Sequence, residues 1–83
     1  MRKGKQRPSL DQPSTYQIKV SGRVDAHWFE WDIDVMVCVE KDNEGLPVST
    51  MTVFLDQATL QGLLRRIYSY GLPLISVIYV QVE

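Results

Sequence analysis

The sequence predicts a single α+β domain, with a four-stranded, mostly antiparallel sheet, one long helix on one sheet face and one short helix. Three observations predict this class. The chain has 83 residues, which is the size of one small domain. Four segments have the alternating or β-branched pattern that is typical of strands. One later segment has apolar residues at helical spacing.

Residues 1–15 are predicted to form a disordered basic tail ahead of a domain over residues 16–83. Four bases against one acid give the tail a charge of +3, which leaves −4 for residues 16–83 out of a total of −1. The tail has one large aliphatic residue, Leu10, and therefore buries too little apolar surface to offset its ordering entropy. It is either an arm for an anionic partner or a solubilising leader, and its lack of aromatic residues favours the leader.

The first strand is predicted from Tyr16, because apolar and polar residues alternate from there to Ser21. Asp25 follows a Ser-Gly pair and has the side chain of a good helix N-cap. We therefore expect a short helix over residues 26–31, with its tryptophan rings packed on the sheet.

Two further strands are predicted as a hairpin. Aliphatic residues alternate along 33–39, and residues 41–47 are rich in turn formers. Residues 48–55, rich in β-branched side chains, form the third predicted strand.

The long helix is predicted to begin after Asp56, which caps it. Its apolar positions recur at i, i+3, i+4 and i+7, and they are Leu60, Leu63, Leu64 and Ile67. Gly71 is placed to end the helix in a left-handed conformation, and Pro73 prevents its continuation. Residues 74–82 form the last predicted strand.

This order of elements fits two arrangements. One is the ferredoxin-like split β-α-β fold with an abbreviated first helix. The other is a β-meander followed by the long helix and the last strand. Residues 22–32 are short for a crossover between parallel strands, so both arrangements stay open.

The second face of the sheet is predicted to be a homodimer interface. One long helix covers one face, and the other face of an antiparallel sheet is expected to be polar when water covers it. The last strand instead has apolar residues at both parities. The residues expected at this interface are Met36, Ile75, Val77 and Tyr79. The alternative is internal cover by the two tryptophans and the short helix, or by the tail.

No catalytic or metal-binding pattern is recognised, so we expect a non-enzymatic domain without a cofactor. The acids between residues 25 and 44, with His27, do not have the spacing of a known metal site and indicate a solvated acidic edge. His27 is the one histidine, Cys38 lies in mid-strand, and the chain has neither a nucleophile elbow nor a glycine-rich phosphate loop.

The alternative function is a small-molecule sensor, with Trp28 and Trp31 near the ligand. Nucleic acid is not expected as a partner, because base-stacking platforms accompany basic grooves and residues 16–83 carry −4. No apolar run approaches the ~20 residues of a membrane span. A single cysteine excludes an internal disulfide, and we expect a cytoplasmic protein.

Two segments resemble a family of small bacterial proteins with no established activity. The segments DQATLQGLLRRI at 56–67 and GLPLISV at 71–77 are similar to the family's "DQAALHGLL" helix and "LGLPLLSV" strand. Residues 22–31 resemble its Gly-x-Leu-Asp-Pro-x-Trp-x-x-Trp segment, with Ala26 in place of the proline. Gln61 stands where the family has histidine, which weakens any idea of a shared catalytic base. The resemblance covers roughly residues 16–80 and implies one folded unit without an assigned mechanism.

Overall fold

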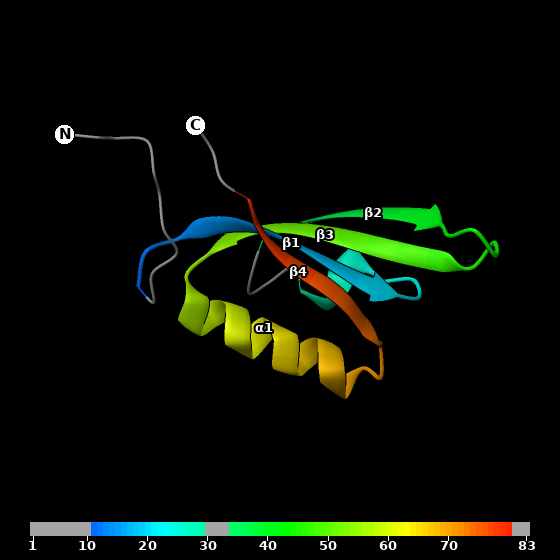
Figure 1. The fold of residues 1–83 in the computed structure, drawn as a ribbon. Helices are drawn as coiled ribbons and strands as arrows, with labels where there is room; N and C mark the ends of the chain where they lie inside the picture. Colours follow the sequence, from blue (N-terminus) through cyan, green and yellow to red (C-terminus); the bar gives the residue numbers. More distant parts are fainter. Residues whose placement is uncertain (1–10, 30–33, 81–83) are drawn as a thin grey trace.

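The computed structural model describes residues 11–29 and 34–80 (Figure 1). Four strands, one α-helix and one turn of 3-10 helix make up this part of the chain. They are β1 (Ser14–Ser21), η1 (Ala26–Trp28), β2 (Val35–Lys41), β3 (Pro47–Leu55), α1 (Gln57–Ser69) and β4 (Leu74–Val80).

The strands form one sheet in the order β2-β3-β1-β4, and every neighbouring pair is antiparallel. β1 and β2 are not neighbours, so the meander arrangement is not formed. α1 connects β3 to β4, and β1 lies between these two strands (Figure 1).

The prediction of two helices is wrong: α1 is the single α-helix of the described residues, and the segment after Asp25 makes one three-residue turn. The Asp25 carboxylate accepts a hydrogen bond from the His27 N–H at 3.0 Å, and the Asp25 carbonyl accepts one from the Trp28 N–H at 3.0 Å. The second bond spans three residues, which closes a 3-10 turn rather than an α-turn. The end of the expected helix, at Glu30 and Trp31, lies outside the described residues.

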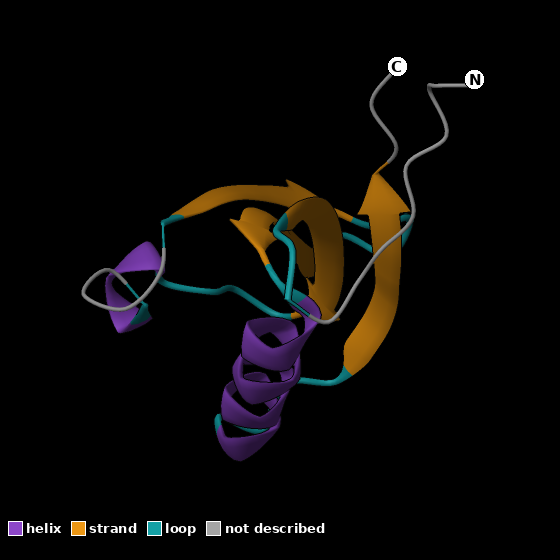
Figure 2. Ribbon diagram, turned by 90° about the vertical axis from the view of Figure 1, so that its left-hand side faces the viewer, coloured by secondary structure: helices purple, strands orange, loops and turns teal. Residues whose placement is uncertain are grey.

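The core lies between one face of the sheet and the layer formed by α1 and the η1 connection (Figure 2). The alternation in β1 predicts this face correctly, because its apolar positions are all buried. β3 presents buried residues opposite them, and α1 adds three from its apolar stripe. The buried apolar residues are Tyr16, Ile18, Val20, Val24, Phe29, Met51, Val53, Leu55, Leu60, Leu63 and Ile67.

Both predicted ends of the long helix are confirmed. The Asp56 carboxylate accepts a hydrogen bond from the Thr59 N–H at 2.8 Å, which satisfies one of the free amides of the first turn. Gly71 has a φ of +79°, and its N–H donates to the Tyr68 carbonyl at 2.9 Å. Leu72 then packs against the core, so the chain turns back into β4.

A buried hydroxyl on β3 holds the chain that leaves β1. The Ser49 side chain accepts a hydrogen bond from the Val24 N–H at 2.9 Å and donates one to the Gly22 carbonyl at 2.7 Å. Gly22 has a φ of +113°, a conformation that favours glycine. Ser49 thereby connects β3 to the turn that leads into η1.

Candidate functional site

The sheet face opposite α1, here called the open face, is the main candidate surface. Antiparallel strands place paired residues on the same face, so the register gives its membership. No described element packs against this face (Figure 2). Its residues are Thr15, Gln17 and Lys19 of β1, Met36, Cys38 and Glu40 of β2, Thr50, Thr52 and Phe54 of β3, and Ser76, Ile78 and Val80 of β4.

Exposed apolar side chains gather at one end of the open face. Phe54 is 68% exposed, Met36 74% and Ile78 51%, and we call these three residues the apolar patch. Met36 and Ile78 lie at the two ends of one row across the four strands, and Phe54 belongs to the next row. The charged side chains Lys19 and Glu40 belong to the rows beyond Met36. The three members of the patch are uncharged, and they lie at one end of a mostly polar face.

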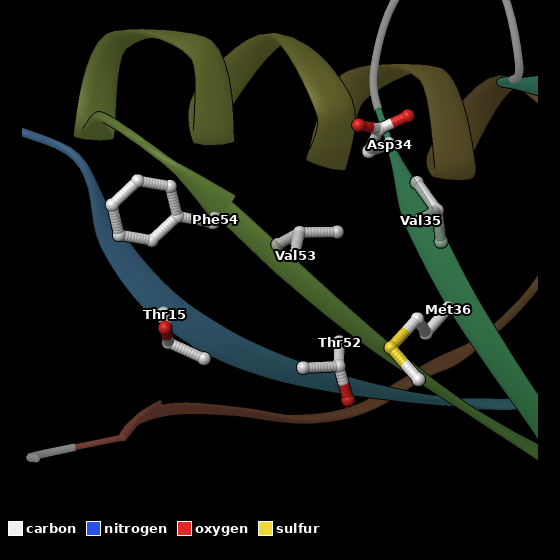
Figure 3. Close-up of a pocket in the computed structure, with 7 residues that line it drawn as sticks. All are labelled: Thr15, Asp34, Val35, Met36, Thr52, Val53 and Phe54. Atoms are coloured by element: carbon white, nitrogen blue, oxygen red, sulfur yellow. The ribbon is translucent and has the colours of Figure 1, made fainter.

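A shallow hollow of about 460 Å³ lies beside two members of the apolar patch, Met36 and Phe54 (Figure 3). Phe54 of β3 and Met36 of β2 stand on either side of Val53 and Thr52 in this view, and the Asp34 carboxylate lies at the rim just before β2. A second hollow of about 290 Å³ adjoins the first, because Met36 and Thr52 line both. Its walls include the exposed thiol residue Cys38.

The structure does not bring the four predicted interface residues onto one face. Met36 lies in the apolar patch. Val77 and Tyr79 pair with the core residues Ile18 and Tyr16, which places them on the helix side of the sheet. The Tyr79 ring lies 5.8 Å from that of Tyr16 and packs against the core.

Ile75, the fourth predicted interface residue, lies at a register shift. Ser76 pairs with Lys19 and Leu74 with Val20, so Ile75 is the extra residue of a bulge at the start of β4. It is exposed at the outer edge of the sheet.

The sequence-based prediction did not include Phe54 and Ile78, which the structure exposes on the open face. Apolar residues on each side of Phe54 are buried, so the alternation within residues 51–55 places Phe54 on the opposite face. This alternation could have identified Phe54 from the sequence. Ile78 is identified by its pairing with Gln17, which local sequence does not show.

The predicted ligand residue Trp28 is part of a packed aromatic cluster. Its ring centroid lies 4.5 Å from that of Tyr70 and 6.4 Å from that of Phe29. The Arg66 guanidinium lies 6.0 Å from the centroid of the Phe29 ring. This cluster joins the η1 connection to the end of α1, and Trp28 lines neither hollow. Trp31, the other predicted ligand residue, lies outside the described residues.

The pKa of the Asp56 carboxyl is lowered by hydrogen bonds that cap α1, so this shift belongs to the helix end and not to the open face. The hydroxyl and the backbone N–H of Thr59 hold the pKa of the Asp56 carboxyl below its ordinary value. In residues 11–29 and 34–80, no three His, Cys, Asp or Glu side chains come close enough to hold a metal ion. No helix in those ranges has the length and apolar character needed to cross a membrane.

The comparisons with known proteins give a family without an assigned activity. No curated protein and no solved structure matches the chain. The family described as "Domain of unknown function (DUF8691)" matches residues 15–78, which span β2, β3, α1 and most of β1 and β4. The match covers most of the chain, and the protein belongs to this uncharacterised family.

Proposed function

We propose that this domain is a non-enzymatic interaction module that forms a homodimer through the open face. The observation that carries the proposal is the apolar patch, whose three members are each at least half exposed on a face that no described element covers. Domains are usually built from two or more packed layers, and apolar side chains gathered on one exposed surface are typical of contact sites.

The size of the open face suits a dimer of modest affinity. Four strands about 4.8 Å apart and seven residues at about 3.3 Å each give a face of roughly 20 by 23 Å. Its projected area is about 450 Å², and protruding side chains make its accessible area larger. Stable complexes bury about 800 Å² per partner, so the whole open face has to take part.

The charge on the open face favours a second copy as the partner. Residues 16–83 carry −4, whereas the strands of this face hold one base, Lys19, and one acid, Glu40, in different rows, with the Asp34 carboxylate at the rim. Two copies related by a two-fold axis can place each Lys19 near Glu40 of the partner, with the uncharged patches in contact. Sheets that pack face to face in this way keep their strand directions within about 30° of each other.

The test is the mass of the full chain in solution, measured by native mass spectrometry and by light scattering. Phe54→Glu places a charge in the patch and is expected to halve the mass of the wild-type assembly. Tyr68→Glu is the control, because Tyr68 is 83% exposed on α1 and belongs to neither face of the sheet. A Phe54→Glu protein with a native circular dichroism spectrum and an unchanged mass would exclude the open-face dimer, as would a monomeric wild type.

A second candidate function is the binding of a small molecule in the larger hollow. Its volume of about 460 Å³ lies within the range of ligand sites, and Thr15, Thr52 and Asp34 add a few polar groups to mostly apolar walls. Extra mass on the purified protein, released by heating and absent from Phe54→Glu, supports this function. Bare protein that binds nothing from a metabolite pool argues against it.

Two further expectations remain part of this proposal. The single cysteine, Cys38, agrees with a cytoplasmic location, and the resemblance of residues 56–77 to a bacterial family agrees with a bacterial origin. Fractionation of the source cells tests the location. Recovery of the protein from a membrane or secreted fraction would contradict it.

A further inference from the structure

β4 forms one outer edge of the sheet, and apart from a bulge at its start it lacks the charges and prolines that protect exposed edges. Its sequence, LISVIYV, contains no charged residue and no proline. The opposite edge strand, β2, ends in Glu40 and Lys41 and is preceded by Asp34. Proteins usually place charges or prolines on edge strands, because the free N–H and C=O groups otherwise pair with another chain.

Apolar side chains border the β4 edge on both sides of the sheet. Val77, on the helix side, is 37% exposed, and Ile78 on the open face is half exposed. α1 therefore does not fully cover Val77. The bulge at Ile75 bends the beginning of the strand and leaves Ser76–Val80 in regular pairing with β1. This regular segment is the part of the edge beside which a second strand can align.

We infer that β4 pairs antiparallel with β4 of a second copy, which joins two four-stranded sheets into one continuous sheet. The strand is complementary to itself in this orientation. A pair centred on Val77 places Ile75 opposite Tyr79, and a pair centred on Ile78 places Val77 opposite Tyr79. An uncharged strand offers nothing to select a charged peptide, whereas a second copy supplies the same neutral, β-branched sequence.

The chain's own tail is a poor occupant of this edge. Residues 1–10 read MRKGKQRPSL and carry four bases and a proline with a single large aliphatic residue. Such a segment has little tendency to form a strand beside apolar neighbours. The second copy is therefore the occupant that the composition of β4 favours.

The edge pair is compatible with the open-face dimer and does not depend on it. The two-fold axis of an edge pair is perpendicular to the sheet, and that of a face-to-face pair lies parallel to the sheet. If these two axes intersect at right angles, they generate a closed assembly of four copies, which is a common symmetry of soluble oligomers. We therefore expect the wild type to contain four chains.

The experiment compares the mass of the full chain with that of Val77→Lys by native mass spectrometry. In either centred register, the two copies of residue 77 are direct or diagonal neighbours, so their charges repel. We expect the mass to fall from four chains to two, and deuterium uptake in residues 74–80 to rise. Tyr68→Lys is the matched control and is expected to keep four chains. If Val77→Lys fails to fold, Ile75→Lys replaces it, because Ile75 is exposed at the same edge.

A mixing experiment distinguishes β4 pairing from a general effect of charge. Val77→Lys and Val77→Glu chains of different mass are combined, and opposite charges at the seam are expected to restore assemblies of four that contain both. A folded Val77→Lys protein that keeps the wild-type mass would overturn the edge pair, as would a mixture that stays at two chains. The open-face dimer is tested separately by Phe54→Glu. One interface can therefore be refuted while the other stands.

Discussion

Ser49→Ala tests how much of the fold depends on one buried hydroxyl. Ser49 is fully buried in β3, and its side chain bonds to the backbone of both Gly22 and Val24. The substitution removes one oxygen atom and leaves the methyl group. It therefore changes hydrogen bonding with little change in volume.

The expected loss follows from the two bonds. Each hydrogen bond contributes about 1 kcal/mol net, and a buried group left without a partner costs about 1–3 kcal/mol. Val24 is 4% exposed, so its N–H has no ready access to water in Ser49→Ala. We expect the free energy of unfolding to fall by about 2–4 kcal/mol, which is a large part of the 5–15 kcal/mol typical of a domain.

The assay is urea unfolding followed by circular dichroism. We expect the same dependence of the unfolding free energy on urea concentration in both proteins. A domain of this size loses about 4–8 °C of melting temperature for each kcal/mol, so the melting temperature is expected to fall by roughly 8–32 °C. Because unfolding releases any oligomer, the proteins are compared at equal chain concentration.

Ser69→Ala is the control for the loss of a hydroxyl in general. The Ser69 side chain donates a hydrogen bond to the Arg66 carbonyl at 2.6 Å, but it lies on the exposed end of α1, where water replaces it. Its loss is expected to change stability by less than about 0.5 kcal/mol. If Ser49→Ala costs no more than Ser69→Ala, the connection after β1 does not depend on Ser49 and the reasoning is refuted.

Three further substitutions test single features. The Tyr16 hydroxyl is buried without a hydrogen-bond partner, so Tyr16→Phe is expected to keep or raise the free energy of unfolding in urea, and a loss above about 1 kcal/mol would indicate a bond that the structure does not show. The pKa of Asp56 is lowered by folding, so its carboxylate stabilises α1 above the ordinary pKa and this contribution is lost as the pH falls through the lowered value. Asp56→Asn, which keeps a good cap, is expected to remove that part of the acid dependence of the melting temperature; an unchanged pH profile would contradict it. Gly22→Ala strains a backbone with a φ of +113° and places Cβ 3.0 Å from Leu72 Cδ2, so thermal unfolding is expected to show a loss of about 1–3 kcal/mol, and a neutral result would mean that the turn relaxes.

The elements that depend on local sequence were predicted well. Asp56 and Gly71 determine the ends of α1 through contacts with residues a few positions away, and both are found as expected. The prediction of a short helix after Asp25 also relied on local sequence, and it was wrong. A single capping side chain also closes a 3-10 turn, and the spacing of Asp25 and Trp28 does not distinguish the two.

The candidate site was predicted less well, because the face of a strand depends on its register. The last strand has apolar residues at both parities, so its sequence does not indicate which set faces α1. The pairing of Ile18 with Val77 places that row on the helix side and leaves Ile78 on the open face. The bulge at Ile75 interrupts the alternation, so Leu74 pairs with Val20 although Ser76 pairs with Lys19.

The position of β4 at the edge gives a physical reason for its two apolar rows. A strand in the middle of a sheet with one wet face needs apolar residues on one side, as β1 shows with Gln17 and Lys19 opposite its core residues. β4 has the same wet face, yet its row there contains Ile78 and Val80. Solvent alone does not favour such a row. If four copies assemble, Ile78 is covered from the open face and Val77 from the edge, so both rows of β4 become buried. Val77→Lys and Phe54→Glu together should therefore yield a folded monomer with circular dichroism like that of the wild type.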